Sequence, residues 1–299
     1  MAAQIQNDQR NFNVFCGLPV QYADGDIAIY DNVKEVTLVH PWKCTTNLIT
    51  LVCGGQMHTE LNGRPLDIGM GNILLCPPNS IFDNFSCSDD FECKVLSLSD
   101  HIVQSLLRDK IDIWHGSVYV NQTNIIRMSD NCKENFIFYY ALIRSKIEQK
   151  DTPVASTEII QALIRVLLLE LTAILIQFSD LVPEKKMSQG KQLFNKYLNM
   201  ISSNEVKRRP IALYASELAI TPKYLTMLCL RYSGKTASDW VIQYTVEDIR
   251  YNLRNTGLSI KEVAAKMGFA NMSHFGSYVR KHLGMSPSDY REQASGLED

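Results

Sequence analysis

Residues 259–291 contain the pattern that most constrains how this chain folds. Ser259 and Glu262 form a capping box, in which each side chain bonds the backbone of the other residue at a helix start. Apolar residues then recur at helical spacing as far as Gly268, which suits a left-handed helix stop. The pattern predicts a short helix that ends in a tight turn.

A second helix follows this turn and has two chemically different sides. Asn271 is placed to cap it and Gly284 to end it, and a Ser-Pro pair then starts a third helix. Its apolar side consists of Phe275, Tyr278, Val279, His282 and Leu283. Its polar side consists of Ser273, His274, Ser277, Arg280 and Lys281. Two helices joined this way indicate a helix-turn-helix, with a plain three-helix packing unit as the alternative.

A second copy of the pattern lies fifty residues upstream and favours the helix-turn-helix. Thr221 and Pro222 form another helix start, and Gly234 follows thirteen residues after Thr221, as Gly284 follows Asn271. The outer side of this helix carries Lys223, Tyr224, Met227 and Arg231. The two units span about residues 211–234 and 259–284. Between them, residues 236–255 predict one helix of roughly 30 Å, close to the roughly 34 Å between successive major grooves on one side of DNA.

The C-terminal segment resembles the DNA-binding domain of the AraC/XylS family of transcription regulators. The resemblance rests on SIKEVAAKMGF and NMSHFGSYVRKHLGMSPSDYR, and upstream on YASELAITPKYLTMLCLRYSGKTASDWV. It covers about residues 190–294. Where the family often has Phe-Lys-Lys near the end of the second recognition helix, this chain has Val279-Arg280-Lys281, which keeps an apolar residue and two cations.

The polar sides of the two recognition helices are the expected DNA-binding surface. Arg and Lys pair with guanine edges, Ser and His serve bases or phosphates, and helix-start amides hold phosphates. The expected contact residues are Thr221, Lys223, Tyr224, Met227 and Arg231 in the first unit, and Asn271, Ser273, His274, Ser277, Arg280 and Lys281 in the second. The resemblance implies promoter DNA as partner, dimer formation and activation through RNA polymerase.

Charge and length divide the chain into two parts. Residues 189–299 contain 15 Lys and Arg against 10 Asp and Glu, a net charge of +5, whereas residues 1–188 contain 15 against 22, a net charge of −7. A basic C-terminal part suits contact with phosphates. We therefore expect an N-terminal domain over residues 1–180, a linker over 181–188 and a DNA-binding domain over 189–299.

The N-terminal part predicts a small β-barrel with trailing helices, which makes the fold class α+β. Short strand-like runs occur at 35–39, 48–53, 57–61, 72–76 and 92–98, and Asn62-Gly63 is a strong hairpin turn. Helical patterns follow at about 130–149 and 154–178. This order resembles the cupin-like domain that precedes the DNA-binding domain in many family members, and it implies a small-molecule effector. His40, His58 and Glu60 are expected either as ordinary strand residues or as polar groups inside the effector pocket.

Other chemistry is poorly supported by the sequence. A metal-dependent cupin enzyme fused to a DNA-binding module needs two His one residue apart and a later His, but His58-Thr59-Glu60 supplies one His and one acid. We expect no metal, no cofactor and no enzymatic activity. An architectural DNA binder without effector control remains the other alternative. The sequence names neither the effector nor the operator.

Scattered cysteines and a polar N-terminus predict a cytoplasmic protein. The eight cysteines include no Cys-x-x-Cys pair, and the first residues do not form an apolar signal. The most apolar run, residues 159–178, includes Gln161, Arg165 and Glu170, too polar for a bilayer span. The helix at 154–178 is the expected dimer contact, with packing against its own barrel as the alternative.

Overall fold

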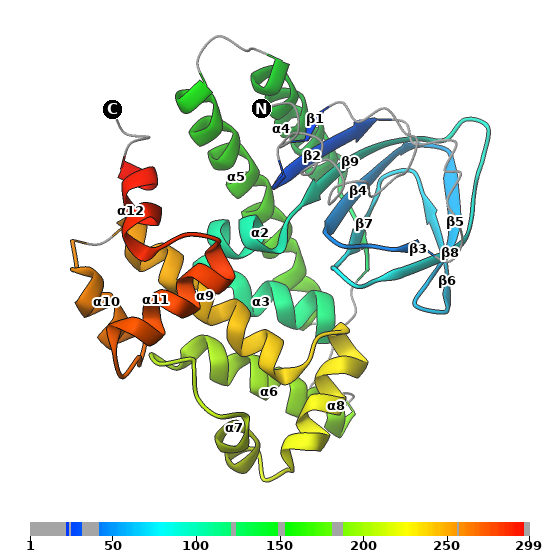
Figure 1. The fold of residues 1–299 in the computed structure, drawn as a ribbon. Helices are drawn as coiled ribbons and strands as arrows, with labels where there is room; N and C mark the ends of the chain where they lie inside the picture. Colours follow the sequence, from blue (N-terminus) through cyan, green and yellow to red (C-terminus); the bar gives the residue numbers. More distant parts are fainter. Residues whose placement is uncertain are drawn as a thin grey trace. The chain divides into compact units, whose positions relative to one another are not determined.

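The computed structural model describes residues 22–23, 25–31, 42–120, 124–148, 153–180, 188–255 and 257–295. The chain divides into two compact units, residues 1–183 and 184–299. The N-terminal unit has antiparallel β-strands followed by helices, and the C-terminal unit is helical (Figure 1). The predicted α+β fold class is confirmed.

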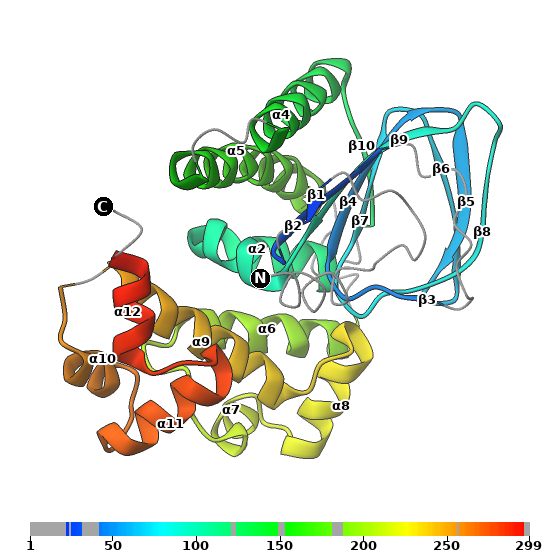
Figure 2. The ribbon, with the colours of Figure 1, turned by 45° about the horizontal axis from the view of Figure 1, so that its top comes forward.

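The N-terminal unit has two antiparallel sheets that face each other, as Figure 2 shows. One sheet has the strand order β1-β2-β9-β4-β7-β10 and the other β3-β8-β5-β6. The strands are β1 (Tyr22–Ala23), β2 (Ile27–Asp31), β3 (Trp42–Lys43), β4 (Asn47–Gly54), β5 (Gln56–Leu61), β6 (Arg64–Gly69), β7 (Asn72–Cys76), β8 (Ile81–Cys87), β9 (Glu92–Leu98) and β10 (Ile125–Arg127).

Alternate residues of these strands fill the space between the sheets. Leu48 and Val52 of β4 belong to this apolar core with Met57 and Leu61 of β5. Because successive side chains point to opposite faces of a strand, Ile49 and Leu51 lie on the other face of β4, where they are also buried. The larger sheet is thus buried on both faces along β4, which explains why this strand is a nearly continuous apolar run.

The expected strands and hairpin are present wherever the structure describes them. The runs at 48–53, 57–61, 72–76 and 92–98 lie in β4, β5, β7 and β9. Asn62 and Gly63 have positive φ values of 54° and 73°, as a two-residue turn between β5 and β6 requires. The run at 35–39 lies outside the described residues.

Helices cover the outer face of the larger sheet (Figures 1 and 2). They are α2 (Asp100–Leu106), the 3-10 turn Arg108–Lys110, α3 (Ile111–His115), the π turn Gly116–Val120, α4 (Asp130–Glu148) and α5 (Pro153–Asp180). Tyr140 of α4 donates hydrogen bonds to the Tyr30 carbonyl at 3.0 Å and to Asp31 Oδ1 at 2.8 Å. These bonds attach α4 to β2.

The helix α5 is the longest described helix and is strongly apolar. Its segment Thr157–Gln177 is long and apolar enough to cross a membrane by length and composition alone. A single such helix is weak evidence for a span, because core helices of soluble proteins pass the same test. One side of α5 is buried in its own unit through Ile164, Leu168 and Leu175. The buried side of α5 packs within its own unit against α2, α3 and α4.

The C-terminal unit consists of helices joined by short turns. They are α6 (Gln189–Ser203), α7 (Ile211–Glu217), α8 (Pro222–Ser233), α9 (Ala237–Asn255), α10 (Ile260–Lys266), α11 (Met272–Leu283) and α12 (Pro287–Ser295). The pairs α7–α8 and α10–α11 are the two predicted helix-turn-helix units, and α9 connects them as one continuous helix (Figure 1).

Candidate nucleic-acid interface

The first recognition helix, α8, starts and ends on local signals. Thr221 Oγ1 accepts a hydrogen bond from the Tyr224 amide at 3.2 Å, with Pro222 as the first helical residue. Gly234 ends the helix with a φ of 66°, a conformation that costs glycine little. Leu225, Leu228 and Cys229 are buried on the inner side, so the opposite side of α8 faces outward.

The second recognition helix, α11, is built in the same way. Asn271 Oδ1 accepts from the His274 amide at 2.8 Å, and Gly284 ends the helix with a φ of 79°. Phe275 and Val279 are fully buried against α9, α10 and α12. The helix is thereby held with its polar side outward.

The helix that precedes α11 has the predicted capping box. The Glu262 amide donates to Ser259 Oγ at 3.2 Å, and the Ser259 amide donates to Glu262 Oε2 at 2.7 Å. These hydrogen bonds from Ser259 favour the ionised carboxylate and lower the pKa of Glu262. The residue at which α10 begins is therefore specified by its own first turn.

All eleven residues predicted to contact DNA are exposed. They are Thr221, Lys223, Tyr224, Met227, Arg231, Asn271, Ser273, His274, Ser277, Arg280 and Lys281. His282, assigned to the apolar side of α11, is half-buried and its ring packs at a tilt against Tyr278, with 4.4 Å between ring centroids. Desolvation, and secondly Lys281, lowers the pKa of His282. The exposure is what DNA contact requires, and the contact itself stays a prediction.

Sequence reasoning missed one residue on the outer side of α8. Leu230 is 48% exposed, in a helix whose other leucines are buried. The fifty-residue repeat pairs Leu230 with Arg280, which had been assigned to the interface. The repeat therefore contained the signal, because Leu230 and Arg280 occupy equivalent positions.

The connecting helix α9 packs against both helix-turn-helix units. Trp240, near its start, is fully buried and donates through Nε1 to Ser233 Oγ at 2.9 Å, directly behind α8. Ile249 and Leu253, near its end, belong to the apolar core that holds α10 and α11. One rigid helix therefore sets the distance between the two recognition helices.

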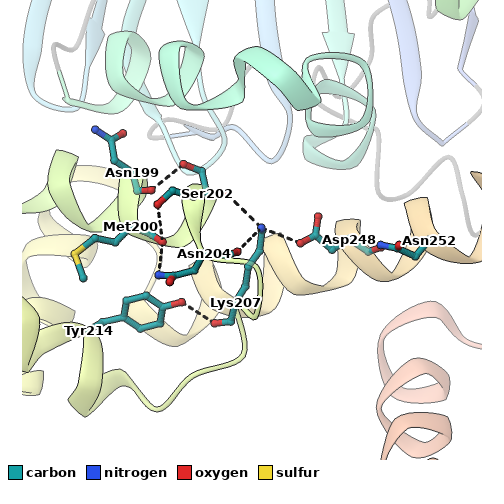
Figure 3. A network of polar contacts seen from close by, with 9 residues as sticks. Asn199, Met200, Ser202, Asn204, Lys207, Tyr214, Asp248 and Asn252 are labelled. Carbon is teal, nitrogen blue, oxygen red and sulfur yellow. Dashed lines mark hydrogen bonds and ion pairs between the residues drawn. The ribbon is translucent and has the colours of Figure 1, made fainter. Parts of the chain in front are cut away.

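Polar contacts link the short loop before α7 to α9 (Figure 3). Lys207 Nζ lies 2.9 Å from Asp248 Oδ2 in the middle of α9, and these side chains are only 11% and 10% exposed. The same ammonium donates to the carbonyls of Ser202 at 3.3 Å and Asn204 at 3.0 Å. Its charge is thus well satisfied in a position nearly removed from water.

The next residue of this loop, Arg208, reaches the second helix-turn-helix unit. Arg208 Nη2 donates to the Gly268 carbonyl at 3.2 Å, and the guanidinium lies 4.3 Å from the centre of the Phe269 ring. Gly268 and Phe269 form the turn between α10 and α11. The segment 204–209 therefore ties the entrance of the first unit to α9 and to the turn of the second.

The residues predicted for an effector pocket do not come together inside the barrel. His58 Nδ1 lies 2.7 Å from Asp67 Oδ1 with the His58 side chain 44% exposed, and Glu60 accepts from Asn84 Nδ2 at 2.9 Å. Both alternate along β5 with the core residues Met57 and Leu61, so they lie on the outer face. The strict alternation in this strand would have predicted that placement. His40 lies outside the described residues.

No group of three or more His, Cys, Asp or Glu side chains suited to a metal ion occurs among the described residues. The buried cysteines of the barrel behave as small apolar residues. Burial raises the pKa of the Cys44 thiol to about 12 and that of Cys76 well above its usual range. Both thiols are therefore neutral at physiological pH, which suits packing rather than catalysis.

Comparison with known proteins agrees with this geometry. Residues 214–293 match the model of a helix-turn-helix domain. The transcriptional regulator YdiP of Escherichia coli K12 is 40% identical over 55 residues, which is 18% of this chain and 18% of that protein. The Msm operon regulatory protein of Streptococcus mutans is 21% identical over 252 residues, 82% of this chain and 84% of that one.

Similarity over most of the chain extends to a second operon regulator. The melibiose operon regulatory protein of Escherichia coli K12 is 23% identical over 245 residues, 80% of this chain and 78% of that one. A solved DNA-binding transcriptional dual regulator from Escherichia coli K-12 is 26% identical with a TM-score of 0.31 and covers 35% of this chain and 93% of that one. The C-terminal unit is a helix-turn-helix domain of the AraC type, and the relatives that match most of the chain are operon regulatory proteins.

Proposed function

We propose that this protein is a sequence-specific transcription regulator that binds promoter DNA with α8 and α11 in successive major grooves. The observation that carries the proposal is the pair of outward recognition helices fixed on α9. Its 19 residues span about 28 Å, close to the roughly 34 Å repeat of the groove. The matched helix-turn-helix model and the operon regulators among the relatives support the same function.

Two arginines test this proposal. Arg231→Ala and Arg280→Ala should each weaken specific binding by about 1–3 kcal/mol, because each removes a donor suited to a guanine edge. Lys196→Ala is the matched control, since Lys196 is an exposed cation on α6, outside both recognition helices. Binding is measured by footprinting a target promoter with the full-length protein. Footprints of both arginine variants identical to wild type would exclude this recognition surface.

The N-terminal unit is proposed to bind a small-molecule effector and to make the protein a cytoplasmic, non-enzymatic activator that contacts RNA polymerase. Support comes from the operon regulators that match along both units. An effector that binds the folded state raises thermal stability by mass action. A metabolite screen should therefore contain a compound that raises Tm and changes promoter transcription in vitro. A screen without any shift would leave an architectural DNA binder as the better description.

The exposed side of α5 is proposed to pair with a second copy of the chain. Four large apolar residues, Ile159, Val166, Leu169 and Ile176, are 38–43% exposed. With the exposed Ala162 and Ala173 between them, they follow the alternating three- and four-residue spacing of a coiled-coil seam. Arg165 and Glu170 flank the seam five residues apart. In a parallel pair, Arg165 of one copy would lie beside Glu170 of the other.

Charge reversal tests this dimer. Arg165→Glu and Glu170→Arg should each weaken self-association, because each places like charges together, and the double variant should restore it. The oligomeric state is measured by sedimentation of the full-length protein. Lys146→Glu is the control, since Lys146 belongs to α4 and lies off the seam. A monomer at all concentrations, or no recovery in the double variant, excludes the parallel seam.

A further inference from the structure

The two recognition helices present different chemistry at equivalent positions. Superposed by the fifty-residue repeat, α8 has an apolar or aromatic residue at three positions where α11 has a polar one. The equivalent pairs are Tyr224 and His274, Met227 and Ser277, and Leu230 and Arg280. The repeat therefore preserves the helix but not the surface that it presents.

The three side chains on the outer side of α8 are exposed rather than packed. Tyr224 is 37% exposed, Met227 51% and Leu230 48%, whereas Leu225 and Leu228 on the inner side are buried. At about 100° per residue, the three exposed residues cover about 120° of the helix surface. Cations flank them, with Lys223 before and Arg231 after. This is an apolar strip between two positive charges on an outward helix.

We propose that α8 recognises thymine methyl groups, while α11 recognises hydrogen-bonding base edges, so that the two half-sites differ in chemistry. The proposal rests on the proposed function and deepens it. The occupant of the strip is the major groove, because the strip takes the place of the face of α11 that carries Arg280, and because the cations at its two ends suit negatively charged DNA. The thymine C5-methyl is the apolar group that bases present there.

The same strip disfavours guanine. Met227 and Leu230 have no hydrogen-bond donor, so guanine O6 and N7 pressed against them would lose water without gaining a partner. Discrimination at this half-site therefore comes from both methyl contact and rejection of unpaired acceptors. At the other half-site, Arg280 supplies the bidentate donor that guanine O6 and N7 favour.

Base analogues that change one group test the proposal. A duplex is first selected from a random pool with the full-length protein. Uracil in place of thymine removes only the C5-methyl, and each uracil in the α8 half-site should weaken binding about threefold to fivefold, the value of one buried methyl group. Replacing guanine by 7-deazaguanine removes only N7 and should weaken binding in the α11 half-site.

Two protein variants complete the test. Met227→Ala and Leu230→Ala should lose sensitivity to uracil but keep sensitivity to 7-deazaguanine, which also shows that the variants are folded and bind DNA. Arg280→Ala should show the reverse pattern. This crossed dependence assigns each half-site to its helix, because a general loss of stability would weaken both responses together.

The alternative outcomes separate the two proposals. If no duplex is enriched from the pool, sequence-specific binding fails and this inference fails with it. If a duplex is enriched but uracil has no effect in either half-site, the function stands and the methyl contact is wrong. If Met227→Ala and Leu230→Ala bind DNA as wild type but reduce transcription by RNA polymerase, the strip is a protein contact instead.

Discussion

At the residue scale, the nearly buried Lys207–Asp248 pair links the loop before α7 to α9. A pair with both partners nearly buried contributes little compared with an apolar replacement, but removal of one partner leaves the other charge in a poor solvent. We predict that Lys207→Met destabilises the C-terminal unit by about 3–5 kcal/mol. Hydrogen exchange of the α9 amides in the full-length chain measures this unit separately from the barrel.

The matched control is the same substitution at a pair whose acidic partner is exposed. Lys133, whose side chain is 26% exposed, lies 3.7 Å from Asp130, whose side chain is 98% exposed. Because Asp130 stays in water when Lys133 is replaced, Lys133→Met should change stability by less than about 1 kcal/mol. The double variant Lys207→Met with Asp248→Leu should recover part of the loss, since no buried charge then remains. Equal effects at Lys207 and Lys133 would falsify the claim that burial sets the cost.

At the scale of elements, α9 and the segment 204–209 hold α8 and α11 as one body. We predict that inserting either five or ten base pairs between the half-sites reduces binding to the level of one recognition helix. Five added base pairs place the second major groove on the opposite side of the duplex. Ten added base pairs keep it on the same side but move it about 34 Å further than α9 reaches. Gel-shift titration of the full-length protein on the two lengthened duplexes measures the loss.

Substitution of the base pairs between the half-sites, without insertion, is the control for this experiment. It keeps the spacing and should leave affinity nearly unchanged, apart from a sequence-dependent cost of bending. Retained affinity after the ten-base-pair insertion would mean that the units move independently. The contacts of Lys207 and Arg208 would then not control the spacing.

The elements that could be predicted from sequence are those that local signals specify. Thr221, Gly234, Asn271 and Gly284 define α8 and α11 within a few residues, because caps act over one helical turn. The link from Lys207 to Asp248 spans 41 positions and has no periodic signal, so it required the structure. For His58 and Glu60, two alternatives were open, and the alternation of buried residues along β5 places both on the outer face.

At the scale of the molecule, the two units divide the work by charge and by surface. Residues 1–183 carry a net charge of −8 and residues 184–299 a net charge of +6, so attraction to DNA phosphates is confined to the C-terminal unit. The exposed apolar seam of α5 belongs to the first unit. In the proposed dimer, the paired N-terminal units therefore bring two basic C-terminal units to one promoter.

This arrangement predicts how an isolated C-terminal unit behaves. A fragment of residues 184–299 should bind a single operator about as well as the full-length protein, because both recognition helices are present. On DNA with two operators, the fragment should bind about a hundredfold or more weaker than the full-length protein. The fragment lacks α5, so the second binding event is no longer intramolecular. Gel-shift titration on both duplexes gives this ratio.

Full-length Val166→Lys, in which a charge interrupts the seam, should reproduce the fragment's pattern. An equal loss on one and two operators would instead indicate that the fragment is poorly folded, and no loss on either would exclude a role for α5 in pairing.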